Sequence, residues 1–182
     1  MRAAGERVYV RLLEAEDAPD LLELRVRNRD FLRPWEPRRP GMRYTLEEQT
    51  SQLAFALESA AADRAYHFGI FVPAGELVGT ITLSNVARRA WQNATIGYFV
   101  DEQHNGKGFA TDAIRLVTRL AFTELGLHRV QAGVMPRNPA SMRALEKAGY
   151  RREGLSLRYL HINDVWEDHV MFAITQEELD RR

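Results

Sequence analysis

Residues 103–110 read Gln-His-Asn-Gly-Lys-Gly-Phe-Ala, a glycine-rich turn whose natural chemistry is anion binding. The apolar run at 96–100 before it is typical of a strand, and the residues after it repeat apolar side chains at the i, i+4, i+7, i+8 spacing of one helix face. Such a turn presents free backbone N–H groups and the positive end of a helix dipole at one point, which suits a phosphate. Gly106 and Gly108 would let the backbone approach this ligand without an intervening Cβ atom.

Two common phosphate-binding motifs do not fit this turn. A dinucleotide-binding loop needs a third glycine where this chain has Thr111, and the spacing of a Walker loop is absent. On these residues alone, the turn either binds a phosphate or simply joins a strand to a helix. The elements around it have to decide between the two interpretations.

The hydrophobic pattern predicts strands and helices on both sides of the turn. We expect strands at 8–12, 66–72, 77–83, 95–100, 128–134 and 166–174, with another near 150–154. We expect helices at 18–28, 46–62, 109–125 and 140–148. Thr45 and Glu48 form a capping-box pattern, and Gly149 is a helix stop signal. The order predicts a three-layer α+β fold, with a mixed, mostly antiparallel sheet between helices.

Length and composition exclude several classes of protein. At 182 residues, the chain is expected to form a single domain over 1–182. Its 25 basic and 25 acidic side chains cancel, which argues against a general nucleic-acid binder. It has no cysteine, so we expect no disulfide, no thiol nucleophile and no thiolate metal site. We expect no metal cofactor of any other kind. Neither a signal sequence nor an apolar run of membrane-spanning length is present, and we predict a cytoplasmic protein with no membrane partner.

The segment 30–37 breaks the periodic pattern, with two prolines and two aromatic residues. Phe31 and Trp35 either pack into the core or form a wall of a substrate site, because loops often carry binding residues. The segment through residue 43 is basic, since Glu36 is outnumbered by Arg33, Arg38, Arg39 and Arg43. This charge disfavours a polycationic substrate.

Two motifs together resemble a known family. The pattern Gln103-x-x-Gly106-x-Gly108 resembles the acetyl-CoA pyrophosphate loop of the GCN5-related N-acetyltransferases, the GNAT superfamily. The pair Asn138-x-x-Ser141, followed by Leu-Glu-Lys-Ala-Gly-Tyr at 145–150, is similar to a second block of that family. The predicted order of elements is also the GNAT order. The resemblance implies acetyl transfer from acetyl-CoA to a primary amine, by direct attack in a ternary complex.

Two further stretches, 28–37 and 159–170, resemble the ribosomal-protein-alanine N-acetyltransferases of the RimJ/RimL type. The branch implies a protein N-terminal amine as acceptor. Its relatives also modify small amines, so an amino acid, a polyamine or an antibiotic is an alternative acceptor. A CoA-binding regulatory module without turnover is an alternative from a different class. The fold often dimerises, which makes a homodimer possible.

The resemblance also implies roles for residues. Acetyl-CoA would bind the backbone of Tyr98, Phe99 and Val100, with Asn138 on the opposite wall. Its pyrophosphate would bind the loop residues Gln103, His104, Asn105, Gly106, Lys107, Gly108, Phe109 and Ala110. A backbone N–H near Phe99 or Val100 would stabilise the oxyanion.

The remaining catalytic tasks are donation to the leaving thiolate and removal of the proton from the amine. Ser141 would donate a hydrogen bond to the leaving thiolate, unless it only caps the short helix expected at 140–148. The strand at 94–100 holds no carboxylate, so the base that some family members carry there is missing. Glu36 is the first candidate for the base, with Asp168, His169 or water as alternatives.

Overall fold

The structure is a computed structural model that describes residues 1–37 and 44–179. Its strands are β1 (Arg2–Ala4), β2 (Tyr9–Leu12), β3 (Tyr66–Phe71), β4 (Leu77–Ala87), β5 (Asn93–Val100), β6 (Arg129–Val134), β7 (Arg151–Ile162) and β8 (Val165–Thr175). Its α-helices are α1 (Ala18–Arg27), α2 (Arg29–Leu32), α3 (Leu46–Ala61), α4 (Phe109–Thr123), α5 (Pro139–Ala148) and α6 (Gln176–Leu179). Two 3-10 turns are η1 (Ala15–Asp17) and η2 (Glu102–His104).

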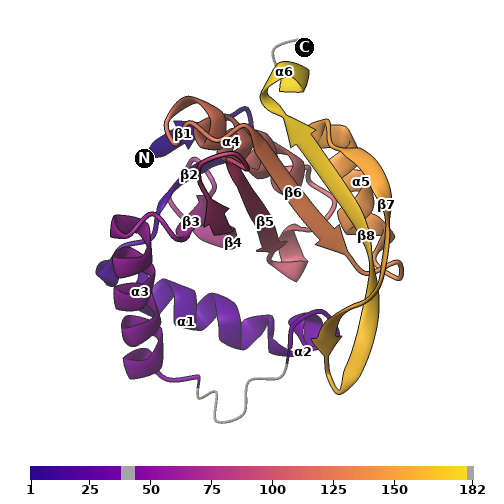
Figure 1. Cartoon of the computed structure of the whole chain (residues 1–182). Coiled ribbons are helices and arrows are strands. Elements are labelled where there is room, and N and C mark those ends of the chain that lie inside the picture. Colours follow the sequence, from indigo (N-terminus) through magenta and orange to yellow (C-terminus); the bar gives the residue numbers. More distant parts are fainter. Residues whose placement is uncertain (38–43, 180–182) are drawn as a thin grey trace.

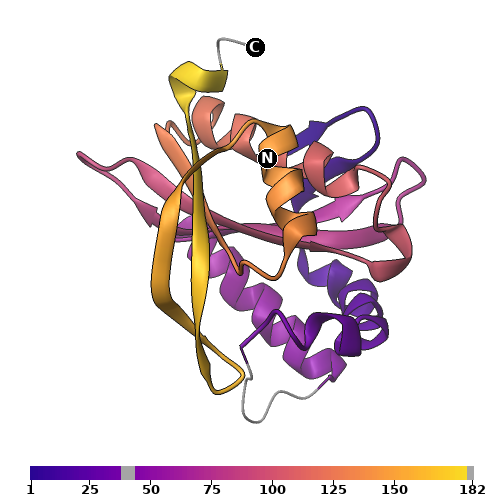
Figure 2. The ribbon, with the colours of Figure 1, turned by 90° about the vertical axis from the view of Figure 1, so that its right-hand side faces the viewer.

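The strands of this described part form one eight-stranded sheet in the order β1-β2-β3-β4-β5-β6-β8-β7 (Figure 1). Strands β5 and β6 are parallel, and every other neighbouring pair is antiparallel. Helices α4 and α5 cover one face of the sheet, whereas α1, α2 and α3 cover the other (Figure 2). The predicted three-layer α+β architecture is confirmed.

Helix α4 shows why the sequence pattern predicts a buried helix so well. Its residues Ala113, Val117 and Ala121 are fully buried, and Leu116 and Leu120 are 4% exposed. They pack in the same cluster as the apolar residues of β3 to β6. Burying a Val or Leu side chain stabilises by about 1.5–3 kcal/mol, so this one face anchors the helix behind the glycine-rich turn.

Helix α2 and strand β1 are among the short elements that were not predicted. Helix α2 lies inside the segment predicted as a loop, and it begins directly after α1 because the Leu32 N–H donates to the Asn28 carbonyl at 2.9 Å. Leu32 is 5% exposed and anchors this turn in the interior. Strand β1 pairs with β2 although its three residues carry no alternation of polarity. Neither element is long enough to show a period in sequence.

Strands β5 and β6 separate partway along their length. The parallel register pairs only Asn93, Ala94 and Thr95 with β6. Residues 96–100 remain paired with β4 but have no partner on β6 within the described chain. The backbone of these residues is therefore open on one side, as the family resemblance implies.

None of the helices in residues 1–37 and 44–179 has both the length and the apolar character needed to cross a membrane.

Candidate active site

The glycine-rich turn connects β5 to α4 through two residues with left-handed backbones. Gly106 has φ +77° and Gly108 has φ +81°, values that favour glycine because other residues meet steric cost there. Helix α4 begins directly afterwards, at Phe109. The turn therefore points the N-terminus of the long buried helix at the space above β5, where an anion would be stabilised.

Hydrogen bonds within η2 already occupy the first backbone N–H groups of the loop. The N–H groups of Gln103, His104 and Asn105 donate to Asp101 Oδ1, the Asp101 carbonyl and the Glu102 carbonyl, at 3.3, 2.8 and 3.2 Å. The N–H groups of 106–111 have no acceptor within the part of the chain that the structure describes. Those of 108–111 belong to the first turn of α4, which lacks intrahelical partners, and those of 106 and 107 lie in the turn before it. The loop was expected to offer backbone N–H groups to a phosphate from residue 103 onwards, but the N–H groups that are available are those of residues 106–111.

The turn is tied to helix α1 on the opposite face of the sheet. Asn28, which is fully buried, accepts from the Glu102 N–H at 2.9 Å and donates to the Leu24 carbonyl at 2.9 Å. Arg27 Nε donates to Asp101 Oδ2 at 2.9 Å. Because both contacts arise at the end of α1, the same helix end positions the turn and leads into Phe31.

Three potential metal ligands, Glu76, Asp101 and His104, lie within 4.8 Å of one another beside the turn. The Arg27 guanidinium lies 2.8 Å from Asp101 and 3.7 Å from Glu76, so it already supplies a positive charge to this group. His104 also stacks on Phe109, with ring centroids 5.8 Å apart. We therefore assign the group a structural role under the turn.

A cavity of about 880 Å³ runs along the open side of β5. Among the residues predicted to bind acetyl-CoA, Gln103 lies outside it, on an exposed position of η2. The predicted residues that line it are Phe31, Trp35, Glu36, Tyr98, Phe99, Val100, His104, Asn105, Gly106, Lys107, Gly108, Phe109, Ala110, Asn138 and Ser141. One space therefore brings together segments more than a hundred residues apart.

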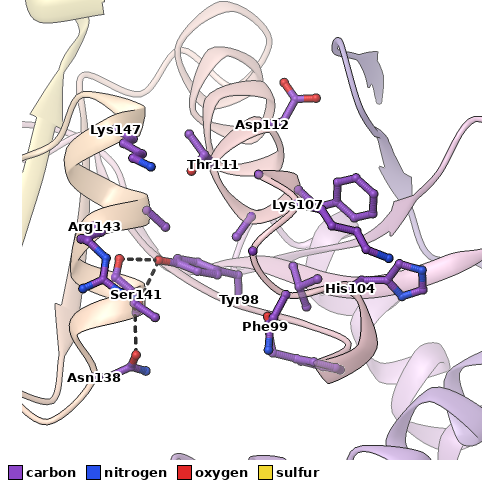
Figure 3. Close-up of a pocket in the computed structure, with 18 of the residues that line it drawn as sticks. Tyr98, Phe99, His104, Lys107, Thr111, Asp112, Asn138, Ser141, Arg143 and Lys147 are labelled. Atoms are coloured by element: carbon purple, nitrogen blue, oxygen red, sulfur yellow. Dashed lines mark hydrogen bonds between the residues drawn. The ribbon is translucent and has the colours of Figure 1, made fainter.

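The cavity also holds basic residues that were not predicted from the sequence. Arg7, Arg115, Arg143 and Lys147 join Lys107 at its lining. Figure 3 shows Lys107 on the turn, and Arg143 and Lys147 on helix α5 across the cavity from it. Arg143 and Lys147 are four positions apart and so share one face of α5. That spacing was a usable signal, but only the fold shows that this face borders the turn. Arg7 Nη1 donates to the Lys107 carbonyl at 3.2 Å, and nothing local predicts this contact.

Asn138 and Ser141 lie at the start of α5, on the wall opposite β5. The Asn138 side chain accepts from the Ser141 N–H at 3.1 Å, which makes Asn138 the N-cap of α5. The Tyr98 hydroxyl reaches across from β5 to Ser141, 2.9 Å from Oγ and 3.1 Å from the carbonyl oxygen (Figure 3). The family resemblance implied a role only for the backbone of Tyr98, whereas the structure adds its hydroxyl.

The register of β5 identifies which backbone N–H groups face the cavity. The Asp101 N–H donates to the Val78 carbonyl of β4 at 2.8 Å. Alternate residues of a strand direct their hydrogen-bonding groups the same way, so the Phe99 N–H also faces β4. The N–H groups of Tyr98 and Val100 then face the gap left by β6. Of the two predicted oxyanion donors, Val100 has the suitable direction and Phe99 does not.

Phe31, Trp35 and Glu36 line the other end of the cavity, and both aromatic rings are half-buried. Both Glu36 carboxylate oxygens contact Arg25 Nη1, at 2.7 and 2.9 Å. The Arg137 guanidinium lies 4.9 Å from the centre of the Trp35 ring and stabilises its position.

The alternative bases lie elsewhere. Asp168 accepts from the Arg158 N–H at 2.7 Å and does not line the cavity. His169 is 3% exposed, and its Nδ1 lies 3.1 Å from the Glu167 carbonyl oxygen, so it is a packed residue away from the cavity. The predicted basic residues Arg38, Arg39 and Arg43 fall outside the described residues.

Comparison with known proteins decides the family. The model of the acetyltransferase (GNAT) domain matches residues 7–151. The chain belongs to the GNAT acetyltransferase family. It is thus an acetyl-CoA-dependent N-acetyltransferase, and the family expected from the two motifs is confirmed. The cavity fits this co-substrate, because free N–H groups and five basic side chains complement phosphates.

Three GNAT relatives cover nearly the whole chain. The chain is 48% identical over 171 residues to a probable N-acetyltransferase of Bacillus subtilis, YjcK, covering 93% of this chain and 94% of the relative. It is 32% identical over 176 residues to the [ribosomal protein uS5]-alanine N-acetyltransferase of Escherichia coli, covering 96% and 91%. The structure of Mycobacterium smegmatis RimJ in complex with CoA-disulfide has a TM-score of 0.89 and 36% identity, covering 94% and 83%.

Proposed function

We propose that this enzyme acetylates the α-amine of a protein N-terminus. The carrying observation is that one cavity joins the glycine-rich turn to the wall of Phe31, Trp35 and Glu36. This continuity lets a donor held by the turn and an acceptor at the aromatic wall meet beside β5. The similarity to an enzyme named for the alanine of ribosomal protein uS5 supports a protein acceptor.

The chain's own groups account for co-substrate binding in this proposal. The N–H groups of 106–111 and the basic side chains around them receive the phosphates. The open backbone of Tyr98 and Val100 pairs with the amides of the pantetheine arm, as a peptide adds to a sheet edge. Asn138 borders this arm from α5.

Transfer then follows from the residues beside the open strand. The neutral amine attacks the thioester carbonyl, a C–N bond forms, and the C–S bond breaks. The Val100 N–H stabilises the oxyanion, and Ser141 donates a hydrogen bond to the leaving sulfur. Glu36 accepts the proton of the amine, directly or through water. The arrangement needs no covalent enzyme intermediate, consistent with the absence of cysteine.

Thermal unfolding with acetyl-CoA, and with NAD as a control, tests the co-substrate site. At about 100 times Kd, binding stabilises by about 2.7 kcal/mol. For a chain of this size that corresponds to an increase in Tm of about 5–10 °C. A shift with acetyl-CoA alone supports the proposal, and no shift at saturation contradicts the assignment of the turn.

Thiol release tests the acceptor, with little background because the chain has no cysteine. We expect release with a peptide that begins with a free alanine, and none with the same peptide acetylated at its N-terminus. Spermidine and free amino acids serve as the comparison. Faster release with either of these than with the peptide would assign the enzyme to small-molecule acceptors.

A further inference from the structure

The Tyr98 hydroxyl is placed where it controls another side chain. It lies 2.9 Å from Ser141 Oγ and 3.1 Å from the Ser141 carbonyl oxygen, across the gap where β6 has left β5. In the part of the chain that the structure describes, Tyr98 is the one hydrogen-bond partner of the Ser141 hydroxyl. A serine hydroxyl rotates freely without such a partner, so its direction depends on Tyr98.

A phenol has one proton, and it can be donated in two ways here. If Tyr98 donates to the Ser141 carbonyl, Ser141 Oγ–H must donate to Tyr98. If Tyr98 donates to Oγ instead, the Ser141 proton is free to point into the cavity. The carbonyl loses little by this change, because it also accepts the helical N–H four residues later.

Tyr98 keeps its proton at the pH where the amine is acetylated. Burial raises the pKa of Tyr98 to about 12, against a smaller opposing effect of the hydrogen bond to Ser141. The phenol therefore remains a donor throughout the neutral range.

We propose that Tyr98 is a positioning residue, whose hydroxyl orients Ser141 so that the serine donates its hydrogen bond to the sulfur of CoA. This role depends on the acetyl transfer proposed above. When the C–S bond breaks, its electron pair moves to sulfur, and the Ser141 proton stabilises the thiolate without leaving oxygen. Solvent supplies the proton that later converts the thiolate to a thiol. Tyr98 itself keeps its proton.

The pKa of the thiol of bound CoA measures this role in the absence of an acceptor amine. Because the chain has no cysteine, CoA is the sole thiol in a mixture of protein and CoA. Its ionisation is followed by the ultraviolet absorbance of the thiolate. The titration stays below about pH 10, because ordinary tyrosines ionise near that pH and also absorb. The same titration without CoA is subtracted. We expect the pKa of the bound thiol to lie about one unit below that of free CoA, because a hydrogen bond to the charged form favours it.

Three variants separate positioning from general stability. Ser141→Ala should return the thiol pKa to the value of free CoA, and Tyr98→Phe should move it part of the way. The double variant should match Ser141→Ala. Tyr150→Phe is the matched control, since this buried tyrosine also bonds a hydroxyl, Thr118 Oγ1 at 2.7 Å, but does not line the cavity. It should lower Tm and leave the thiol pKa unchanged.

The outcomes distinguish this role from the proposed function. A thiol pKa that is the same in Tyr98→Phe and in the unaltered protein, with CoA bound to both, overturns the role of Tyr98. If CoA binds but its thiol keeps the pKa of free CoA, the role of Tyr98 is overturned as well, and the acetyltransferase function stays in place. No binding of CoA, seen as no shift in Tm, overturns the proposed function together with the role.

Discussion

Glu36, the proposed proton acceptor, is oriented by one contact. Both its oxygens are held by Arg25, yet its side chain is 40% exposed toward the cavity. A partly exposed ion pair contributes less than about 1 kcal/mol to stability. The pair is therefore better explained by orientation, because Arg25 holds the carboxylate in the wall that an acceptor amine would approach.

Glu36→Gln removes the proposed proton acceptor and keeps the shape of the side chain. We expect kcat to fall by about 100-fold or more, since a positioned base contributes roughly 10²–10⁴-fold. Thiol release with the alanine peptide measures the change. Glu23→Gln is the control, because Glu23 is 75% exposed, pairs with Arg27 on the surface of α1 and is absent from the cavity. Equal kcat for Glu36→Gln and the unaltered enzyme would assign the proton transfer to water.

Gly108→Ala tests the backbone of the turn. A Cβ atom at this left-handed position would lie 3.3 Å from Arg7 Cδ and Nε, so Arg7 would have to shift. We expect acetyl-CoA affinity to fall about tenfold, or about 1.4 kcal/mol, measured by calorimetry. Gly75→Ala is matched in backbone, with φ +95° and no atom within 4 Å of the added Cβ. An equal loss of affinity in both variants would contradict a local effect at the turn.

At the level of elements, α5 combines structural and functional tasks. Its first turn carries Ser141, and its next turns carry Arg143 and Lys147 along the cavity. Asn138 caps the helix through the N–H of Ser141 itself. A loosened first turn would therefore displace the serine as well as weaken the helix.

Asn138→Ala should lower stability by about 1 kcal/mol, the usual loss of an N-cap. It should also weaken acetyl-CoA binding, because Asn138 lines the cavity. Thr45→Ala is the matched control, since the Thr45 hydroxyl caps α3 by accepting from the Glu48 N–H at 3.3 Å, away from the cavity. Urea unfolding and calorimetry measure the two effects. Unchanged acetyl-CoA affinity in Asn138→Ala would limit Asn138 to capping.

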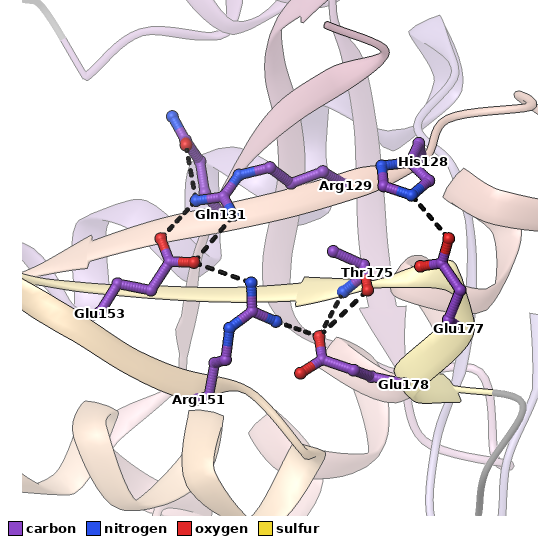
Figure 4. Close-up of polar contacts among 8 residues, drawn as sticks. All are labelled: His128, Arg129, Gln131, Arg151, Glu153, Thr175, Glu177 and Glu178. Atoms are coloured by element: carbon purple, nitrogen blue, oxygen red, sulfur yellow. Dashed lines mark hydrogen bonds and ion pairs between the residues drawn. The ribbon is translucent and has the colours of Figure 1, made fainter.

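For the molecule as a whole, helix α6 is attached to the sheet by charges (Figure 4). Glu153 lies between Arg129 and Arg151, which joins β6 to β7. Arg151 also pairs with Glu178, which accepts from the Thr175 N–H at 2.8 Å and so connects α6 to β8. The network holds three strands and the last helix at one end of the sheet.

These contacts make stability depend on acidic pH. Hydrogen bonds from Arg129 lower the pKa of Glu153. Burial raises the pKa of Glu178, but hydrogen bonds from the Thr175 N–H and Arg151 outweigh it and lower the pKa overall. A carboxyl whose folded pKa is depressed stabilises fully above its unfolded pKa of about 4.3 and loses this contribution as pH falls through the folded pKa.

We therefore expect the urea midpoint to decrease below about pH 4.3 through these groups. Glu178→Gln should lower stability at pH 7 by up to about 1 kcal/mol and reduce the decrease at acidic pH. Glu124→Gln is the control, an exposed residue without an ion pair in the described chain. An unaltered acid dependence in Glu178→Gln would show that other carboxyls control unfolding, among them Asp17, whose pKa is also lowered.

The sequence by itself determined the local features. The glycine-rich turn, the Asn138 cap and the Gly149 stop depend on bonds between residues a few positions apart, so their spacing predicts them. The amphipathic face of α4 was predictable for the same reason, because its period needs no partner to be visible. Together these features were sufficient for the fold class and for the family.

Only the tertiary structure decided which distant groups meet. Tyr98 reaches Ser141, and Arg7 reaches Lys107, because the separation of β5 from β6 and the packing of β2 bring those segments together. The direction of the Val100 N–H depends on the register of β5 with β4. Such contacts arise from strand register and packing between elements, and no local spacing encodes them.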